Sequence, residues 1–336
     1  MPRLRSIQAL RALAALSVAL YHACQWADCG FLIGAAGVDL FFVISGFVIW
    51  LALQDRDLSS ADFLGRRLWR VAPPYWIASL AALAVALAWP RLLPEIYPAP
   101  GHVLLSLLFV PHLDPLGQPF PLLPVGWSLC YEMVFYLLAA AALVEPVRRR
   151  FGRMAWGLVG AMAFGMVFRP AYFLFANPML MQFLAGAAIA RLWIAGRTPR
   201  HGAGWGLLAA GLGLFFALSF FDLYASLWRP LLWGAPAALV LAGAVSLEAE
   251  GRAPRSRLLA RLGEASYSIY LCHWPVVVMV FKLVGPGRAW LSVPLGVGAA
   301  VLTGLAFWRF VEQPLLRWGA RRLFAPRPAL VAQAAE

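Results

Sequence analysis

Apolar residues occur in this chain in long runs that are separated by short polar segments. A helix that crosses a membrane needs about 20 mainly apolar residues. By that rule we predict ten membrane spans, near residues 7–24, 34–53, 74–90, 125–145, 155–168, 178–195, 205–221, 230–247, 266–284 and 289–310. An eleventh run, 102–111, is too short to cross and lies in a Pro-rich segment, so we expect an interfacial or re-entrant piece there. The predicted fold class is all-α: a polytopic integral membrane protein with about ten transmembrane helices.

The basic residues set the expected orientation of these spans. Lys and Arg concentrate in the cytoplasmic loops of membrane proteins. With ten crossings and the N-terminus inside, 21 of the 28 Lys and Arg residues lie in cytoplasmic segments and five lie on the outer side. If residues 102–111 also crossed, the run Arg148 to Arg153 would lie outside, and we reject that topology. Both termini are therefore expected in the cytoplasm.

The composition excludes a water-soluble protein. Hydrophobic residues make up 62% of the chain and charged residues 13%, against about 45–50% and 25% in soluble domains. The net charge of +13 would suit nucleic acid, but cytoplasmic arginines account for most of it, so we expect no nucleic-acid partner. No Cys or His spacing is typical of a zinc site, and we expect no metal. One transmembrane domain over residues 1–325 and a short cytoplasmic tail over 326–336 are expected.

Ionisable side chains inside the spans are candidates for function, because each costs about 2.5–3.5 kcal/mol at a helix centre. Arg11 and His22 are eleven residues apart, which is three helical turns plus about 20°, so they share one face at an axial separation of about 16 Å. An extended cofactor arm could bridge the two. Alternatively, Arg11 snorkels to cytoplasmic headgroups and His22 is hydrated at the outer interface.

Three titratable groups are expected at similar depth in the outer half: His22, Asp39 and Glu132. A His beside a carboxylate is held in the tautomer that leaves one ring nitrogen free to accept a proton, as a general base needs. The alternative is that Asp39 and Glu132 are helix-entry groups that the helix dipole favours. His273 is expected in the inner half, where Arg309 or Glu312 would be its partners, either in a cytoplasmic mouth or in the packing of helix ends.

A basic cluster, FLGRRLWR, directly precedes two prolines. It places Arg66, Arg67 and Arg70 at the cytoplasmic surface. The guanidinium group of arginine can form two parallel hydrogen bonds to a phosphate, so these residues suit phosphate binding. Topology and contact with anionic lipid explain such a cluster equally well.

Six segments in order resemble one family. They are IQALRALAALSVALYHA, GVDLFFVISGFVI, FLGRRLWRVAPPYW, WSLCYEMVFY, SYSIYLCHWPV and FVEQPLLRW, and they extend over nearly the whole chain. Together they resemble the membrane acyltransferase family 3, and the opening segment is most similar to exopolysaccharide O-acetyltransferases of the succinoglycan type.

The resemblance implies a multi-pass protein of the bacterial inner membrane. It would take acetyl-CoA from the cytoplasm and pass the acetyl group to a hydroxyl of a polysaccharide or lipid-linked sugar. Arg11 and His22 match the family's Arg-x10-His pair, and Arg67 and Arg70 match its Arg-x-x-Arg pair. Glu132 and His273 match later polar positions. The SGNH-type hydrolase domain that is fused to some members is absent from this sequence.

These observations combine into one expected mechanism. Arg67 and Arg70 hold the CoA phosphates, Arg11 and His273 also contact the donor, and His22 takes the proton of the acceptor hydroxyl while Asp39 or Glu132 orients its ring. An acyl group held briefly on the histidine is an alternative route. A transporter or flippase of a lipid-linked glycan, or an acyltransferase for an acceptor such as a macrolide, stays open as an alternative function. The sequence does not predict the oligomeric state.

Overall fold

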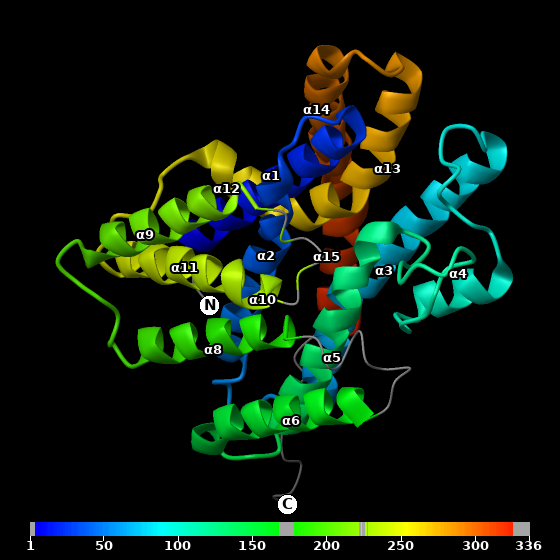
Figure 1. Cartoon of the computed structure of the whole chain (residues 1–336). Coiled ribbons are helices and arrows are strands. Elements are labelled where there is room, and N and C mark those ends of the chain that lie inside the picture. Colours follow the sequence, from blue (N-terminus) through cyan, green and yellow to red (C-terminus); the bar gives the residue numbers. More distant parts are fainter. Residues whose placement is uncertain (1–3, 168–177, 222, 224–225, 227, 325–336) are drawn as a thin grey trace, which may run out of the picture.

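The computed structural model describes residues 4–167, 178–221, 223, 226 and 228–324, and these residues form helices without any strand (Figure 1). Each of the ten predicted spans coincides with a helix. They are α1 (Arg5–Ala27), α2 (Gly37–Ala52), α3 (Ser60–Ala88), α5 (Trp127–Ala142), α6 (Val147–Val167), α8 (Leu180–Ile194), α9 (Ala203–Leu218), α11 (Gly234–Ala249), α13 (Ser266–Val284) and α14 (Ala289–Phe307). The predicted all-α class is confirmed for the described residues.

Seven of the described helical segments are long and apolar enough to cross a membrane, so the chain is a polytopic membrane protein. They are Arg5–Ala27, Leu32–Ala52, Ser60–Ala88, Pro124–Ala142, Arg229–Ala249, Ser266–Val284 and Ala289–Arg322. Helices α8 and α9 are apolar but shorter. The count of ten spans and the cytoplasmic position of the termini stay predictions, and the expected tail over 326–336 lies outside the described residues.

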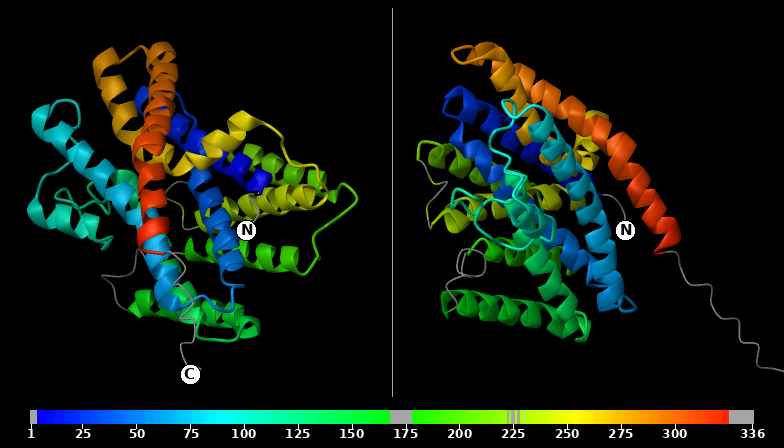
Figure 2. Two further views of the ribbon diagram at one scale, coloured as in Figure 1. Left: turned by 180° about the vertical axis from the view of Figure 1, so that it is seen from behind. Right: turned by 90° about the vertical axis from the view of Figure 1, so that its right-hand side faces the viewer.

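Short helical elements connect and extend the long ones. They are η1 (Leu32–Ala36), α4 (Pro100–Leu107), η2 (Pro124–Gly126), α10 (Arg229–Leu232), α12 (Arg257–Glu264), the π-helical turn η4 (Trp308–Glu312) and α15 (Gln313–Arg322). Helix α4 falls in the apolar run that we judged too short to cross. In Figure 2, α14, η4 and α15 continue one another as a single long rod beside α13 and α3.

Backbone contact between two helices explains two glycines in apolar runs. A Cβ atom at Gly46 on α2 would collide with the carbonyl of Phe183, and one at Gly186 on α8 would collide with the carbonyl of Val43. Small residues let membrane helices approach closely without losing dispersion contacts. Gly186 therefore serves packing within one chain, where α2 lies against α8.

Helix α3 begins well before residue 74, where the third predicted span starts. Ser59 caps it by accepting a hydrogen bond of 3.0 Å from the Asp62 amide, and the helix continues through Pro73 and Pro74. The Tyr267 hydroxyl of α13 donates to the Val71 carbonyl at 2.7 Å, which ties the proline region to a neighbouring helix. The basic cluster that precedes the prolines is consequently part of a helix.

Candidate active site

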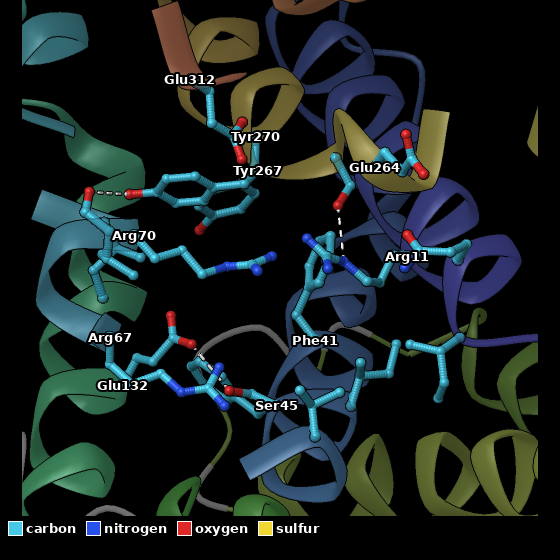
Figure 3. Close-up of a pocket in the computed structure, with 18 of the residues that line it drawn as sticks. Arg11, Phe41, Ser45, Arg67, Arg70, Glu132, Glu264, Tyr267, Tyr270 and Glu312 are labelled. Carbon is cyan, nitrogen blue, oxygen red and sulfur yellow. Dashed lines mark hydrogen bonds between the residues drawn. The ribbon is translucent and has the colours of Figure 1, made fainter. Parts of the chain in front are cut away.

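A cavity of about 600 Å³ lies among α1, α2, α3, α5, α13 and the end of the α14–α15 rod (Figure 3). Its volume is in the range of ligand pockets. Charged side chains converge on it from six helical elements: Arg11, Arg67, Arg70, Glu132, Glu264, Glu312 and Arg317. A concave site with so many ionisable groups inside a membrane helix bundle is a candidate for binding or catalysis.

Helical spacing places two arginines of α3 in the cavity and a third outside it. Arg67 and Arg70 are one turn apart and both line the cavity, whereas Arg66 is exposed and lies over the Phe324 ring at 5.9 Å. Arg11 enters from α1, and its Nε donates to the Ser266 hydroxyl at 3.0 Å. Figure 3 shows Arg11, Arg67 and Arg70 extending into the same space.

The three cavity arginines keep positive charge available to a ligand. Within the described part of the chain, no carboxylate oxygen lies within 4.0 Å of Arg11, Arg67 or Arg70 to form an ion pair. A guanidinium presents a planar fork of donors that matches phosphate or carboxylate oxygens. The arrangement therefore suits an anionic ligand.

Two cavity carboxylates are held by hydroxyl groups. Glu132 accepts a hydrogen bond of 2.9 Å from Ser45 on α2 and one of 2.6 Å from Tyr136, one turn further along α5. Glu312 lies in the π-helical turn and accepts a bond of 2.5 Å from Ser268. Such turns frequently occur at functional sites, because the extra residue directs a side chain out of the regular helical register.

Two histidines lie side by side beyond one wall of the cavity. Tyr270 lines the cavity, its ring centroid is 5.5 Å from that of His273, and the His273 centroid is 5.2 Å from that of His22. The His22 Nδ1 donates to the Gln25 side-chain oxygen at 3.1 Å, which leaves Nε2 as the acceptor in the neutral ring. Arg11 and His22 both face α13, so the predicted shared face of α1 is confirmed.

Asp39 belongs to a separate buried network. Its carboxylate pairs with Arg229 at 3.0 Å and accepts a hydrogen bond of 2.6 Å from Gln182. The guanidinium of Arg229 also lies over the Trp233 ring at 4.8 Å. This network joins α2, α8 and α10 and does not face His22.

Comparison with known proteins identifies the family of the chain. The model of one family, described as an acyltransferase domain, matches residues 4–309. The chain belongs to this acyltransferase family. It is 38% identical to the exopolysaccharide production protein ExoZ of Rhizobium meliloti, over 94% of this chain and 100% of ExoZ. No solved structure matches the chain.

More distant relatives carry related names. The acyltransferase is 26% identical to the peptidoglycan O-acetyltransferase OatA of Listeria monocytogenes, over 94% of this chain and 56% of that protein. It is 28% identical to the putative membrane-bound transacylase BcsY of Komagataeibacter xylinus, over 82% of this chain and 74% of BcsY. The predicted family and the prediction of an acyltransferase enzyme are confirmed.

Three expected placements within the acyltransferase are wrong. Asp39 pairs with Arg229, Glu132 lies with the cavity arginines, and His273 lies beside His22 rather than with Glu312. For Glu132, counting residues from the start of the apolar run gave the wrong neighbours, because the packing of α5 against α13 sets where α5 starts. The Tyr270 hydroxyl donates to the carbonyl of Val125, just before α5, at 2.9 Å, so the start of α5 meets the second turn of α13.

Four polar partners were missed in the sequence. Gln25 and Tyr136 stand three and four residues after the groups they bond, a helical spacing that could have identified them. Gln182 is an amide inside an apolar run, and a search for uncharged polar groups as well as ionisable ones would have found it. Ser45 carries no such signal, because only the packing of α2 on α5 brings it to Glu132.

Proposed function

We propose that this acyltransferase moves an acetyl group from cytoplasmic acetyl-CoA to a hydroxyl of a cell-surface or exported polysaccharide at the bacterial inner membrane. The observation that carries the proposal is a set of three arginines around one cavity of about 600 Å³, none of which forms an ion pair within the described residues. The name of the relative ExoZ, an exopolysaccharide production protein that aligns over its full length, supports the acceptor class.

The arginines account for the donor. Arg67 and Arg70 present two guanidinium forks one helical turn apart, which is the geometry needed to hold adjacent phosphate groups of CoA. Arg11 stands across the cavity from them and is fixed by Ser266 (Figure 3). The remaining length of the cavity towards Tyr270 takes the pantetheine arm, so the thioester comes to the wall beside the histidines.

The chemistry assigned to His22 is general-base catalysis. Its Nε2 takes the proton of the acceptor hydroxyl while the oxygen attacks the acetyl carbonyl, and collapse of the tetrahedral intermediate expels the CoA thiolate. Gln25, not a carboxylate, holds the ring in the productive tautomer. Help from a positioned base of this kind is typically worth about 10²–10⁴ in rate. His22 is partly exposed, and an acceptor approaches it from the side away from the cavity.

Asp39 and Glu132 take different roles from the ones we expected. Asp39 is a packing group, since its carboxylate is fully occupied by Arg229 and Gln182. Glu132 belongs to the donor cavity, which it lines together with the arginines.

The test compares the surface polysaccharide of cells that lack this chain, cells that carry it and cells that carry His22→Ala. O-acetyl signals in the NMR spectrum should appear only with the unaltered chain. Equal polysaccharide yield in all three strains would be expected, because an acetyltransferase decorates the polymer without exporting it. Loss of the polymer itself from the surface would instead indicate a flippase, and full acetylation with His22→Ala would exclude this base.

A further inference from the structure

Within the described residues, one buried nitrogen next to His22 has no hydrogen-bond partner. His273 is completely buried, and its Nδ1 donates a hydrogen bond of 2.6 Å to the Tyr270 carbonyl. Its Nε2 is also buried and has no hydrogen-bond partner within the described residues. A buried polar atom without a partner costs about 1–3 kcal/mol. The fold therefore keeps an acceptor nitrogen at this position at the expense of stability.

His273 lies between the cavity and His22. Its ring centroid is 5.5 Å from Tyr270, which lines the cavity, and 5.2 Å from His22, which does not. A thioester that arrives through the cavity consequently brings its sulfur to the His273 side, while the acceptor hydroxyl meets His22. The proton of the hydroxyl therefore leaves at His22, whereas the sulfur that needs a proton lies at His273.

The hydrogen bonds of both rings leave the same nitrogen available. The Nδ1 of His22 is held by the Gln25 side-chain oxygen, and the Nδ1 of His273 is held by a backbone carbonyl. Neither oxygen carries a hydrogen that it could donate, so in each neutral ring the proton is on Nδ1. Each Nε2 can take up and release a proton without breaking the bond that orients its ring.

We propose, on the basis of the function proposed above, that His273 is a second catalytic residue that returns the proton to CoA. The Nε2 of His22 takes the hydroxyl proton as the C–O bond forms, and this proton passes to the Nε2 of His273. As the C–S bond breaks, His273 gives the proton to the departing sulfur. The products are the acetyl ester and CoA with a free thiol, and both rings end neutral. No other reactant is needed.

The experiment uses the whole protein in liposomes, with radiolabelled acetyl-CoA and polysaccharide isolated from cells that lack this chain. The decisive variant is His273→Asn, whose amide keeps a donor for the Tyr270 carbonyl but has no group in place of Nε2. Cys272→Ala, a change at a buried neighbour on the same helix, is the control for packing. We expect His273→Asn to lower kcat by about 100-fold or more, with the KM for acetyl-CoA changed by less than about threefold.

A second measurement separates proton transfer from packing. The solvent deuterium isotope effect of the unaltered protein should depend on the deuterium fraction in a curved way, because two protons move in the relay. The dependence should become linear in His273→Asn. Retention of at least about a third of kcat, or an unchanged curve, would overturn the relay.

The relay and the proposed function fail in different ways. If the unaltered protein transfers no acetyl group, the proposed function is wrong whatever His273 does. If it transfers acetyl, needs His22 and tolerates His273→Asn, only the relay is wrong.

Discussion

The hydroxyl of Tyr136 donates a 2.6 Å hydrogen bond to the carboxylate of Glu132, one helical turn earlier on α5. Ser45 donates to the same oxygen from α2, so two helices are joined through one carboxylate. A hydrogen bond to a charged group contributes about 1.5–3 kcal/mol. Tyr136→Phe should therefore lower the free energy of unfolding in detergent by about that amount.

A double-mutant cycle checks that the bond to the Glu132 carboxylate causes the loss of stability in Tyr136→Phe. In a Glu132→Gln background, the same Tyr136→Phe change should cost less, because the hydroxyl then donates to a neutral amide. Equal costs in the two backgrounds would show that packing of the ring, and not the bond to Glu132, stabilises α5.

CoA binding should depend on the two arginines of α3 that face the cavity and not on their exposed neighbour. Each of Arg67→Ala and Arg70→Ala removes charge-assisted hydrogen bonds, and we expect affinity for CoA to fall about 10- to 100-fold. Arg66→Ala is a matched control, because it removes the same charge from the same helix on the face away from the cavity. Isothermal titration calorimetry with purified protein measures the CoA affinity of all three variants. An equal loss of affinity in Arg66→Ala would show that surface charge, and not the position in the cavity, causes the effect.

Helix positions could be predicted from the sequence, whereas the partners of polar groups could not. Periodicity and length located the helices because burial in lipid demands long apolar runs with internally satisfied backbones. Arg11 and His22 could be placed on one face because a single helix fixes both. Asp39 was misplaced because its partner, Arg229, is 190 residues away and was counted among the five basic residues of the outer side. Such a contact depends on how helices pack, which no local pattern records.

The buried pair of Asp39 and Arg229 should matter for stability and not for catalysis. Removing one partner of a buried ion pair leaves an uncompensated charge and costs about 3–5 kcal/mol. Arg229→Met should therefore lower the unfolding temperature strongly, and adding Asp39→Leu should restore much of the loss, since no buried charge is left. Where folded protein survives, its KM for acetyl-CoA should equal that of the unaltered chain. A large rise in KM without loss of stability would return Asp39 to the active site.

Acid should loosen the segment around α4, which lies outside the seven membrane-spanning segments. The Nδ1 of His112 donates to the Val110 carbonyl, so its Nε2 accepts the 2.8 Å hydrogen bond from the Nδ1 of His102. Burial, and then the neighbouring His112, lower the pKa of His102 below its ordinary value of 6.5, against a smaller opposing effect of Asp114. The unfolded segment thus binds more protons than the folded one below pH 6.5.

The sign of the pH effect follows from that difference. Stability of the segment should be complete above pH 6.5 and should be lost as the pH falls from 6.5 through the lowered pKa of His102. Amide hydrogen exchange in Pro100–Leu107 measures this, with rates corrected for the intrinsic pH dependence. The double variant His102→Asn with His112→Gln has no titrating group in the pair, so its protection should not change over the same range. Persistence of the pH dependence in that variant would assign it to Asp114 or to another part of the chain.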